Sequence, residues 1–260
     1  RLPEFVDSYT YANLYNEALT NYGESPLYTN EQLAKYQNGS DPYFYPNVNW
    51  YDQVLRTTAP LSEFNLTVSG GQNNVNYYVL LNALTEAGLL KKTKNLTDFS
   101  NNSGYTRYNI RTNVDVNVTK DFTVDFKLGL TIADKTNPKS LNTDGLFDLL
   151  SSIPSNSFPV YNPNNSYGGN ALYSNPWGDM LETGSYTSNK RTFQSVLRLT
   201  HKLDMILPGL SATAGIAFNN RFEGYSHKTR TYQRFAIAQT ESGDVYTSFG
   251  DNTSLSADES

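Results

Sequence analysis

The residue types that most often carry catalysis are sparse in this sequence. It contains no cysteine, which excludes disulfides, thiolate metal ligands and a thiol nucleophile. Its two histidines, His201 and His227, lie far apart and have no carboxylate-rich motif beside them. His201 shares one parity of an alternating segment with Leu199 and Leu203, and His227 lies in a polar segment. We therefore predict no catalytic residue and no cofactor, and we expect a chain that is not an enzyme.

The carboxylates and paired glycines also lack the spacing of known sites. Four scattered aspartates were compared with the calcium-loop pattern, and none fits it: Asp41, Asp52, Asp144 and Asp148. The glycine pairs at 70–71 and 168–169 have no adjoining Lys-Ser or Lys-Thr, so they are interpreted as turn glycines. The sequence predicts no metal site. A glycan-degrading enzyme would need a close pair of acidic residues in a cleft, which spacing along the chain cannot test.

Aromatic residues are the better candidates for binding. Seven of them lie in the two longest polar regions: Tyr43, Tyr45, Trp50, Tyr51, Tyr167, Tyr173 and Trp177. Flat rings stack on sugar faces, and neighbouring asparagine side chains can bond hydroxyl groups. The alternative is that these rings pack the loops against each other or against a partner protein. We take the seven as candidate ligand-binding residues, for sugar-like ligands above all.

Composition narrows the class of protein further. The hydrophobic fraction is 38%, the mean hydropathy is −0.55 and the formal charge is −5. No basic stripe is present, so we do not expect nucleic acid as a partner. No segment approaches the roughly 18 apolar residues of a membrane helix, but membrane β-strands alternate and stay polar on average. The chain starts at Arg1 without an apolar leader, and we expect that part of a longer protein precedes it.

Residues 1–60 have the signals of short helices and loops. The segment from Ser8 to Tyr22 has a helical apolar stripe and is followed by Gly23. A second helix is predicted from Thr29 to Asn38, because Thr29 and Gln32 have capping-box spacing and a glycine follows. The next segment, 40–52, is aromatic and contains two prolines, which excludes a regular strand interior. We expect an ordered, partly helical loop region.

From about residue 62 the pattern changes to strict alternation. In 108–118 one parity is apolar and the other is wholly polar, and 122–132 repeats this pattern after a turn at 119–121. Strand pairs are also predicted at 193–205 with 210–222 and at 63–69 with 75–84. Tight turns therefore alternate with long connections at 85–106, 134–191 and from 224 onward. A further helix is predicted over 143–153 from its apolar spacing.

Length and polarity decide what these strands are. Soluble strands average about 5–6 residues, whereas a tilted membrane strand needs about 9–11. The polar parity carries seven charged residues, and a face this charged must meet water: Arg111, Asp115, Asp125, Lys127, Arg198, Lys202 and Asp204. The apolar parity must then meet lipid, with aromatic residues near the interfaces. The fold class is therefore all-β, a portion of an antiparallel transmembrane β-barrel. A soluble β-sandwich with its apolar face inside is the alternative.

With these segments identified, the chain resembles the SusC/RagA family of TonB-dependent outer-membrane transporters. The matching segments are, in order, 3–9 (PEFVDSY), 15–18 (YNEA), 45–52 (YPNVNWYD), 64–71 (FNLTVSGG), 86–89 (EAGL), 107–115 (RYNIRTNVD) and 203–211 (LDMILPGLS). Their order and spacing hold over most of the chain.

The resemblance implies a barrel of about 22 strands in the outer membrane of a Gram-negative bacterium. It further implies an N-terminal plug, energy from the TonB complex, and a SusD-like surface lipoprotein as partner. Cargoes would be oligosaccharides, or peptides in some members. Residues 1–60 would be an extracellular loop region and 61–260 a partial barrel with a long extracellular loop at 134–191. The plug, the energy-coupling segment and the closing strand have no counterpart here. The alternative function is that of a soluble, secreted, β-rich carbohydrate-binding or adhesion module.

Overall fold

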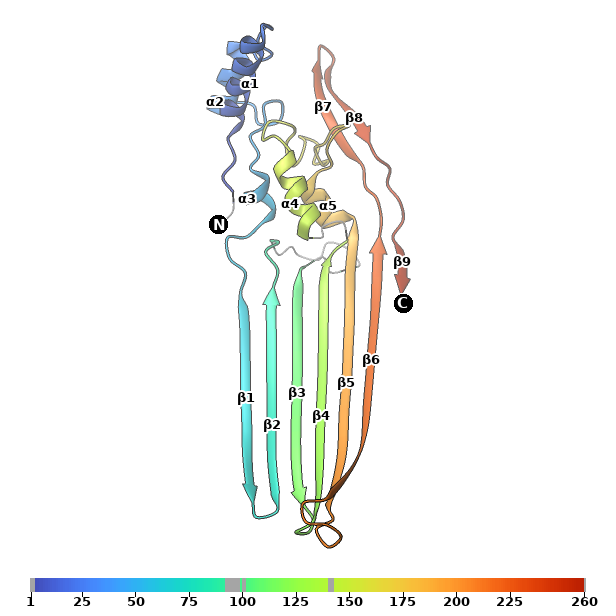
Figure 1. Cartoon of the computed structure of the whole chain (residues 1–260). Coiled ribbons are helices and arrows are strands. Elements are labelled where there is room, and N and C mark those ends of the chain that lie inside the picture. Colours follow the sequence, from blue (N-terminus) through green and yellow to red (C-terminus); the bar gives the residue numbers. More distant parts are fainter. Residues whose placement is uncertain (1–2, 92–98, 100–101, 140–142, 260) are drawn as a thin grey trace.

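The computed structural model describes residues 3–91, 99, 102–139 and 143–259. Residues 1, 2 and 260, at the outer ends of the predicted regions 1–60 and 61–260, lie outside these ranges. Parts of the predicted loops 85–106 and 134–191 also lie outside them. One long sheet carries a group of helices and loops at one end, which we call the cap (Figure 1). The helices are α1 (Ser8–Tyr22), α2 (Asn30–Asn38), α3 (Trp50–Val54), α4 (Thr143–Ser152) and α5 (Pro176–Glu182).

Seven strands form one open antiparallel sheet in the order β1-β2-β3-β4-β5-β6-β9. The strands are β1 (Leu61–Gln72), β2 (Val75–Ala87), β3 (Gly104–Asn117), β4 (Phe122–Pro138), β5 (Gly184–Lys202), β6 (Ser211–Thr229) and β9 (Ser256–Glu259). A separate hairpin consists of β7 (Arg234–Thr240) and β8 (Gly243–Phe249). Figure 1 shows the tight turns of the sheet at the end opposite the cap. The predicted antiparallel, open β-structure is confirmed.

The pairing register places like residues side by side across the sheet. Val114 on β3 pairs with Tyr77 on β2 and with Phe126 on β4, and Phe126 pairs in turn with Leu197. The preceding residue on β3 has polar neighbours instead, because Asn113 pairs with Tyr78 and with Lys127. Since side chains alternate between faces, this register makes one face of the sheet apolar and the other polar.

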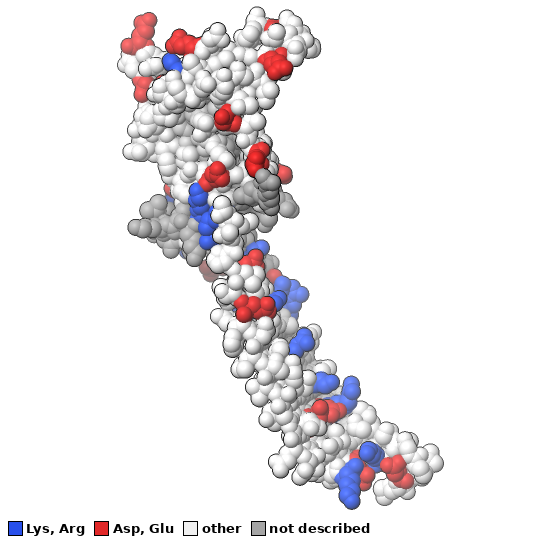
Figure 2. All heavy atoms as spheres, turned by 90° about the vertical axis from the view of Figure 1, so that its left-hand side faces the viewer, with Lys and Arg blue, Asp and Glu red and all other residues white. Residues whose placement is uncertain are grey.

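Neither face is covered by a second layer in the part of the chain that the structure describes (Figure 1). Phe64 is 60% exposed and Ile216 is 70% exposed, although both lie on the apolar face. Val114 and Leu128 are only partly buried, by their neighbours within the sheet. Figure 2, which looks at the sheet from its β1 edge, shows charged side chains gathered along one side of the layer. A soluble sandwich would instead bury its apolar face.

The hairpin turns differ in detail from the predicted ones. Gly70 and Gly71 belong to β1, and the turn consists of Asn73 and Asn74 alone, with Asn73 at φ 47°. Asparagine tolerates this left-handed conformation, which a two-residue hairpin turn requires. The Tyr77 ring lies against Gly70, where a Cβ would come within 2.6 Å of the tyrosine hydroxyl. The predicted loop at 70–74 was therefore too long.

Three further strand ends also differ from the sequence prediction. β5 ends at Lys202, not at residue 205, because the chain turns there: Leu203 N donates to Leu210 O and Gly209 N donates to the Asp204 carboxylate. At the other end β4 continues to Pro138 and β5 begins at Gly184. The connection between them therefore spans 139–183.

The helices α1, α2 and α4 form where the sequence predicts them. α1 ends at Gly23, whose φ of 87° is left-handed, and the Asp7 side chain accepts from Thr10 N at its start. α2 has the complete capping box of Thr29 and Gln32. None of the described helices combines the length and the apolar composition that a membrane-spanning helix needs.

Gly184 joins the cap to the sheet and tolerates no side chain. Its φ is 114°, and a Cβ there would lie 1.9 Å from the Lys228 carbonyl oxygen of the paired strand. Gly209 also has a positive φ, 83°, but nothing lies within 4 Å of its Cβ position. We expect Gly184→Ala to destabilise the folded protein by at least about 2 kcal/mol more than Gly209→Ala. Denaturant midpoints of both variants check this, and equal midpoints would contradict the role of the close contact.

Candidate functional site

The cap has its own hydrophobic core, and the connection 139–183 supplies half of its buried members. The buried members are Trp50, Tyr51, Val54, Leu55, Leu90, Leu150, Ile153, Phe158, Met180 and Leu181. Helices α3, α4 and α5 therefore meet in this core, which lies above one end of the sheet (Figure 1). Leu150 on α4 and Ile153 directly after it belong to this core, so α4 packs against the rest of the cap.

The structure brings five of the seven candidate aromatic residues together. Trp50 and Tyr51 begin α3 and are only 2% and 4% exposed. Tyr167, Tyr173 and Trp177 pack against the same core and are partly buried. Trp177 Nε1 donates to the Tyr161 hydroxyl over 2.9 Å, and the Tyr161 and Tyr167 rings are 5.2 Å apart. Much of the ring surface of this group is thus covered by protein.

The other two candidate aromatics lie in a different part of the cap. Tyr43 is 42% exposed. Tyr45 has the Lys35 ammonium group 4.9 Å from its ring centroid and the Tyr36 ring 5.3 Å away. Burial raises the pKa of Tyr36 to about 12, so its hydroxyl stays protonated at neutral pH. Tyr43 and Tyr45 do not share a site with Trp50 and Tyr51.

A buried polar network holds the long connection against the segment after β6. The Tyr232 hydroxyl lies 2.8 Å from Asp179 Oδ1 and 2.9 Å from the Asn175 carbonyl oxygen, and its single hydrogen is shared between these two acceptors. The Ser174 hydroxyl donates to the other Asp179 oxygen over 2.6 Å. Burial raises the pKa of Asp179 above its ordinary value. This network closes the cap from the β6 side.

A second link ties the same two segments together. The Tyr167 hydroxyl donates to Glu182 over 2.9 Å, and the Arg230 guanidinium pairs with the same carboxylate. Burial raises the pKa of Tyr167, so this hydroxyl remains a donor. Sequence reasoning missed Tyr232 and Arg230, because their partners lie about fifty residues away in the chain.

The polar face of the sheet carries a row of side-chain hydrogen bonds across four strands. Thr131 donates to Asn109 over 2.9 Å, and Asn109 donates to Asn82 over 2.9 Å. Asn82 then donates to Asn65 over 2.7 Å and to Glu63 over 2.8 Å. A row of amides offers hydrogen bonds to water or to polar solutes, as expected for a wall that faces an aqueous space.

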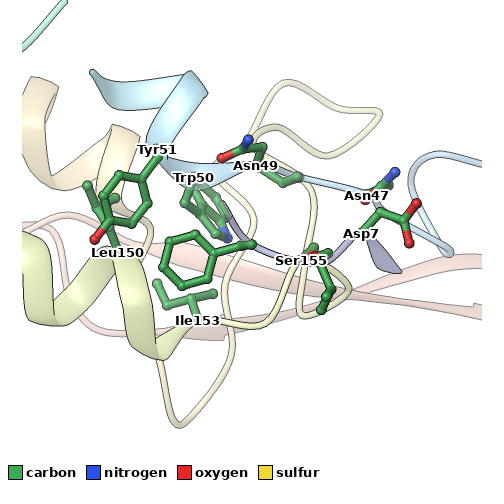
Figure 3. A pocket seen from close by; sticks show the side chains of 11 residues that line it. Asp7, Asn47, Asn49, Trp50, Tyr51, Leu150, Ile153 and Ser155 are labelled. Carbon is green, nitrogen blue, oxygen red and sulfur yellow. The ribbon is translucent and has the colours of Figure 1, made fainter. Parts of the chain in front are cut away.

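A partly open cavity of about 170 Å³ lies where the N-terminal segment passes over α3 and the end of α4 (Figure 3). Trp50 and Tyr51 line it, together with Phe5, Ile153 and Ser155. The last three were not among the candidate ligand-binding residues, because nothing local indicates that residues 5, 50 and 153 meet.

The histidines and carboxylates do not assemble a reactive site in the described ranges. His201 lies beside the Phe122 ring, with 6.0 Å between ring centroids. His227 contacts the Lys139 ammonium group through Nδ1 over 2.7 Å and lies against Tyr186. No group of three or more His, Cys, Asp or Glu side chains suited to a metal ion occurs among the described residues.

Known proteins are similar to parts of this chain. No protein-family model matches it. It is 27% identical over 177 residues to a TonB-dependent receptor of Formosa agariphila, which covers 66% of this chain and 16% of that protein. It is 34% identical over 86 residues to a second TonB-dependent receptor of the same organism, covering 33% of this chain and 7% of that protein. The chain thus spans less than a fifth of the receptors it matches.

A solved structure is similar as well. A chain in the structure of the RagAB peptide importer in its "closed-closed" state matches with a TM-score of 0.53 and 16% identity, over 70% of this chain and 20% of that one. At this identity the match shows the fold. Together with the sequence relatives, it confirms the resemblance to TonB-dependent transporters and the fold of a partial barrel. The sequence relatives are receptors, and the similar structure is that of an importer.

Proposed function

We propose that this chain forms part of the wall and part of the external cap of a TonB-dependent transporter in the outer membrane of a Gram-negative bacterium. The cargo would be oligosaccharides or peptides. The observation that carries the proposal is the register of β1 to β6, which gives a one-layer sheet with one apolar and one polar face, both uncovered within the described residues. Lipid on one side and water on the other satisfy both faces.

Strand length supports the same function. β5 and β6 have 19 residues each, and β3 has 14. At about 3.3 Å per residue, even β3 spans roughly 46 Å along its axis, or about 33 Å at a 45° tilt, enough for an apolar band about 25 Å high. The longer strands would continue beyond the bilayer and carry the cap on the external side.

The partner in this proposal is a SusD-like surface lipoprotein that closes over the cap. Apolar side chains at the tip of the cap, on α1 and just after it, support such a contact, since Leu14, Tyr22 and Leu27 are all more than half exposed. Energy would come from the TonB complex through parts of the protein outside this chain. We expect uptake by the full-length protein to stop when that complex is removed from the cell.

Single cysteines on the two faces test the wall assignment, because this chain contains none. Val114→Cys and Asn113→Cys are neighbours on β3 that point to opposite faces. In the full-length protein in lipid, a nitroxide at 114 is expected to be relaxed by oxygen and shielded from a water-soluble nickel complex. A nitroxide at 113 is expected to show the reverse. Equal access of the nickel complex to both sites would contradict a lipid-facing wall.

The alternative function is the soluble carbohydrate-binding or adhesion module. It requires a dry interior on the apolar side, and the exposed Phe64 and Ile216 do not provide one. A monodisperse full-length protein that stays folded in buffer without detergent would favour this alternative over the transporter.

A further inference from the structure

The cap cavity has an apolar interior and a polar rim. Phe5 stacks on Tyr51 with ring centroids 4.9 Å apart, and the buried Leu150 and Ile153 complete the apolar part of the lining. The rim is polar and is formed by Asp7, Asn47, Asn49 and Ser155. Figure 3 shows these rim residues on the opposite side of the cavity from Leu150. A molecule with both apolar and hydroxyl-bearing surfaces matches such a lining.

Trp50 places an unpaired donor in this cavity. Its side chain is 2% exposed, and its Nε1 has no hydrogen-bond partner among the described residues. Figure 3 shows the indole nitrogen on the side of the ring that is turned toward Ser155. Leaving a buried donor unpaired costs about 1–3 kcal/mol, so this N–H marks the position of an acceptor atom that the described residues do not supply.

We propose that the cavity binds one neutral pyranose ring of a glycan, with Trp50 Nε1 donating to a sugar oxygen. This inference rests on the proposed transport function and names its substrate class. A cavity of about 150 Å³ holds one benzene molecule, so about 170 Å³ has room for one six-membered ring. Trp50 acts through its N–H edge, because the Phe158 ring already lies 5.3 Å from the Trp50 ring.

The rim selects for a neutral sugar. The Asp7 carboxylate accepts a hydrogen bond from Thr10 N over 2.7 Å, which lowers its pKa and keeps it charged at neutral pH. The surrounding segment 3–60 has few cations, Lys35 and Arg56, against a larger set of acidic residues: Glu4, Asp7, Glu17, Glu24, Glu31, Asp41 and Asp52. Figure 2 shows several of the acidic side chains on the surface of the cap. Uronates and sulfated sugars would be repelled here.

A sugar fits better than an aromatic side chain of a peptide. A phenyl ring would fill the apolar part of the cavity but would leave the Trp50 N–H unpaired. A pyranose offers C–H surface to Phe5 and Ile153 and oxygen atoms to Trp50 and the rim. The Asn47 amide nitrogen is available to it, because the recorded bond of Asn47 in the described structure uses its Oδ1, which accepts from Ser8 N.

Binding by the full-length protein in detergent tests the proposal. The probes are immobilised maltohexaose, cellohexaose, laminarihexaose and xylohexaose as neutral glycans, hexagalacturonate as an anionic glycan, and a phenylalanine-containing hexapeptide. Trp50→Phe keeps an aromatic ring but removes the donor, and we expect about 5- to 10-fold weaker binding of the neutral glycan. Val6→Phe adds bulk at an exposed lining position and should abolish binding without removing the donor. Tyr36→Phe, which removes a hydroxyl from a buried ring outside the cavity, should bind normally.

Two results would overturn the inference. One is a wild-type protein that binds none of the neutral probes. The other is unchanged neutral-glycan binding in both Trp50→Phe and Val6→Phe, with protease resistance showing that each variant is folded. Failure here is distinguishable from failure of the transport function. If the nitroxide labels on β3 still report lipid and water faces while glycans do not bind, the wall assignment stands and the substrate class is wrong.

Discussion

Val114→Arg destabilises the membrane-inserted protein by about 2–4 kcal/mol, whereas Asn113→Arg changes its stability by no more than about 0.5 kcal/mol. Val114 lies in the middle of the apolar row, between Tyr77 and Phe126, so an arginine there must enter the hydrocarbon region. The arginine at 113 would enter the polar row beside Lys127, where water solvates it. The two positions are adjacent on β3, so backbone effects are matched.

Chemical unfolding of the full-length protein from lipid vesicles measures this difference, and the folded amount in the outer membrane of a host cell gives a second readout. A soluble protein with a solvent-exposed sheet would show similar small effects for both variants. A β-sandwich would also be destabilised by Val114→Arg. In that fold, however, the nitroxide at position 114 would lie in a dry interior and would be shielded both from oxygen in lipid and from the nickel complex.

Asn175→Asp unfolds the cap locally, with an expected loss of about 3–5 kcal/mol. Asn175 is fully buried, and its Nδ2 donates to the Val160 carbonyl over 2.9 Å and to the Gly168 carbonyl over 2.8 Å. Its Oδ1 caps α5 by accepting from Gly178 N over 3.0 Å. Aspartate can still accept the hydrogen bond from Gly178 N at the start of α5. It places its second oxygen against the two carbonyl oxygens of Val160 and Gly168, however, and both lose their donor.

Asn170→Asp is the matched control in the same connection. The recorded side-chain bonds of Asn170 use only Oδ1, which accepts from Leu172 N over 2.9 Å and from Tyr173 N over 2.8 Å, so a carboxylate can replace it. Hydrogen exchange over 154–183 should accelerate strongly in Asn175→Asp and stay near the wild-type rate in Asn170→Asp. Similar exchange in both variants would show that the two donated bonds of Asn175 do not hold the cap.

Much of the fold could be predicted from sequence because its signals are local. The alternation in β3 and β4 depends on nearest neighbours, and the capping box of α2 spans only Thr29 to Gln32. The start of α5 also had such a signal, since asparagine followed by proline is typical of a helix N-terminus, but it was not used. The exact turn at Asn73 was missed because Gly70 and Gly71 look like turn residues until Tyr77 is seen to cover them.

The candidate site was predicted less well. The sequence identified aromatic residues in loops, but it could not separate the rings that pack the cap core from those that face solvent. Tyr43 and Trp50 have the same local surroundings of aromatics and prolines, yet one is 42% exposed and the other 2%. The ligand-binding role of the seven aromatics stays a prediction, and the cavity at Trp50 gives it a specific form.

The sequence by itself determined which residues alternate and where the first helices begin and end. It also determined that one face of the strands is apolar and the other charged. All of these features depend on residues within a few positions of each other. Only the tertiary structure decided what meets in the cap. Ser155 donates to the carbonyl of Val6, across a separation of 149 residues, and Trp50 lies against Phe158. Contacts at such separations depend on how the whole chain packs, which no local pattern records.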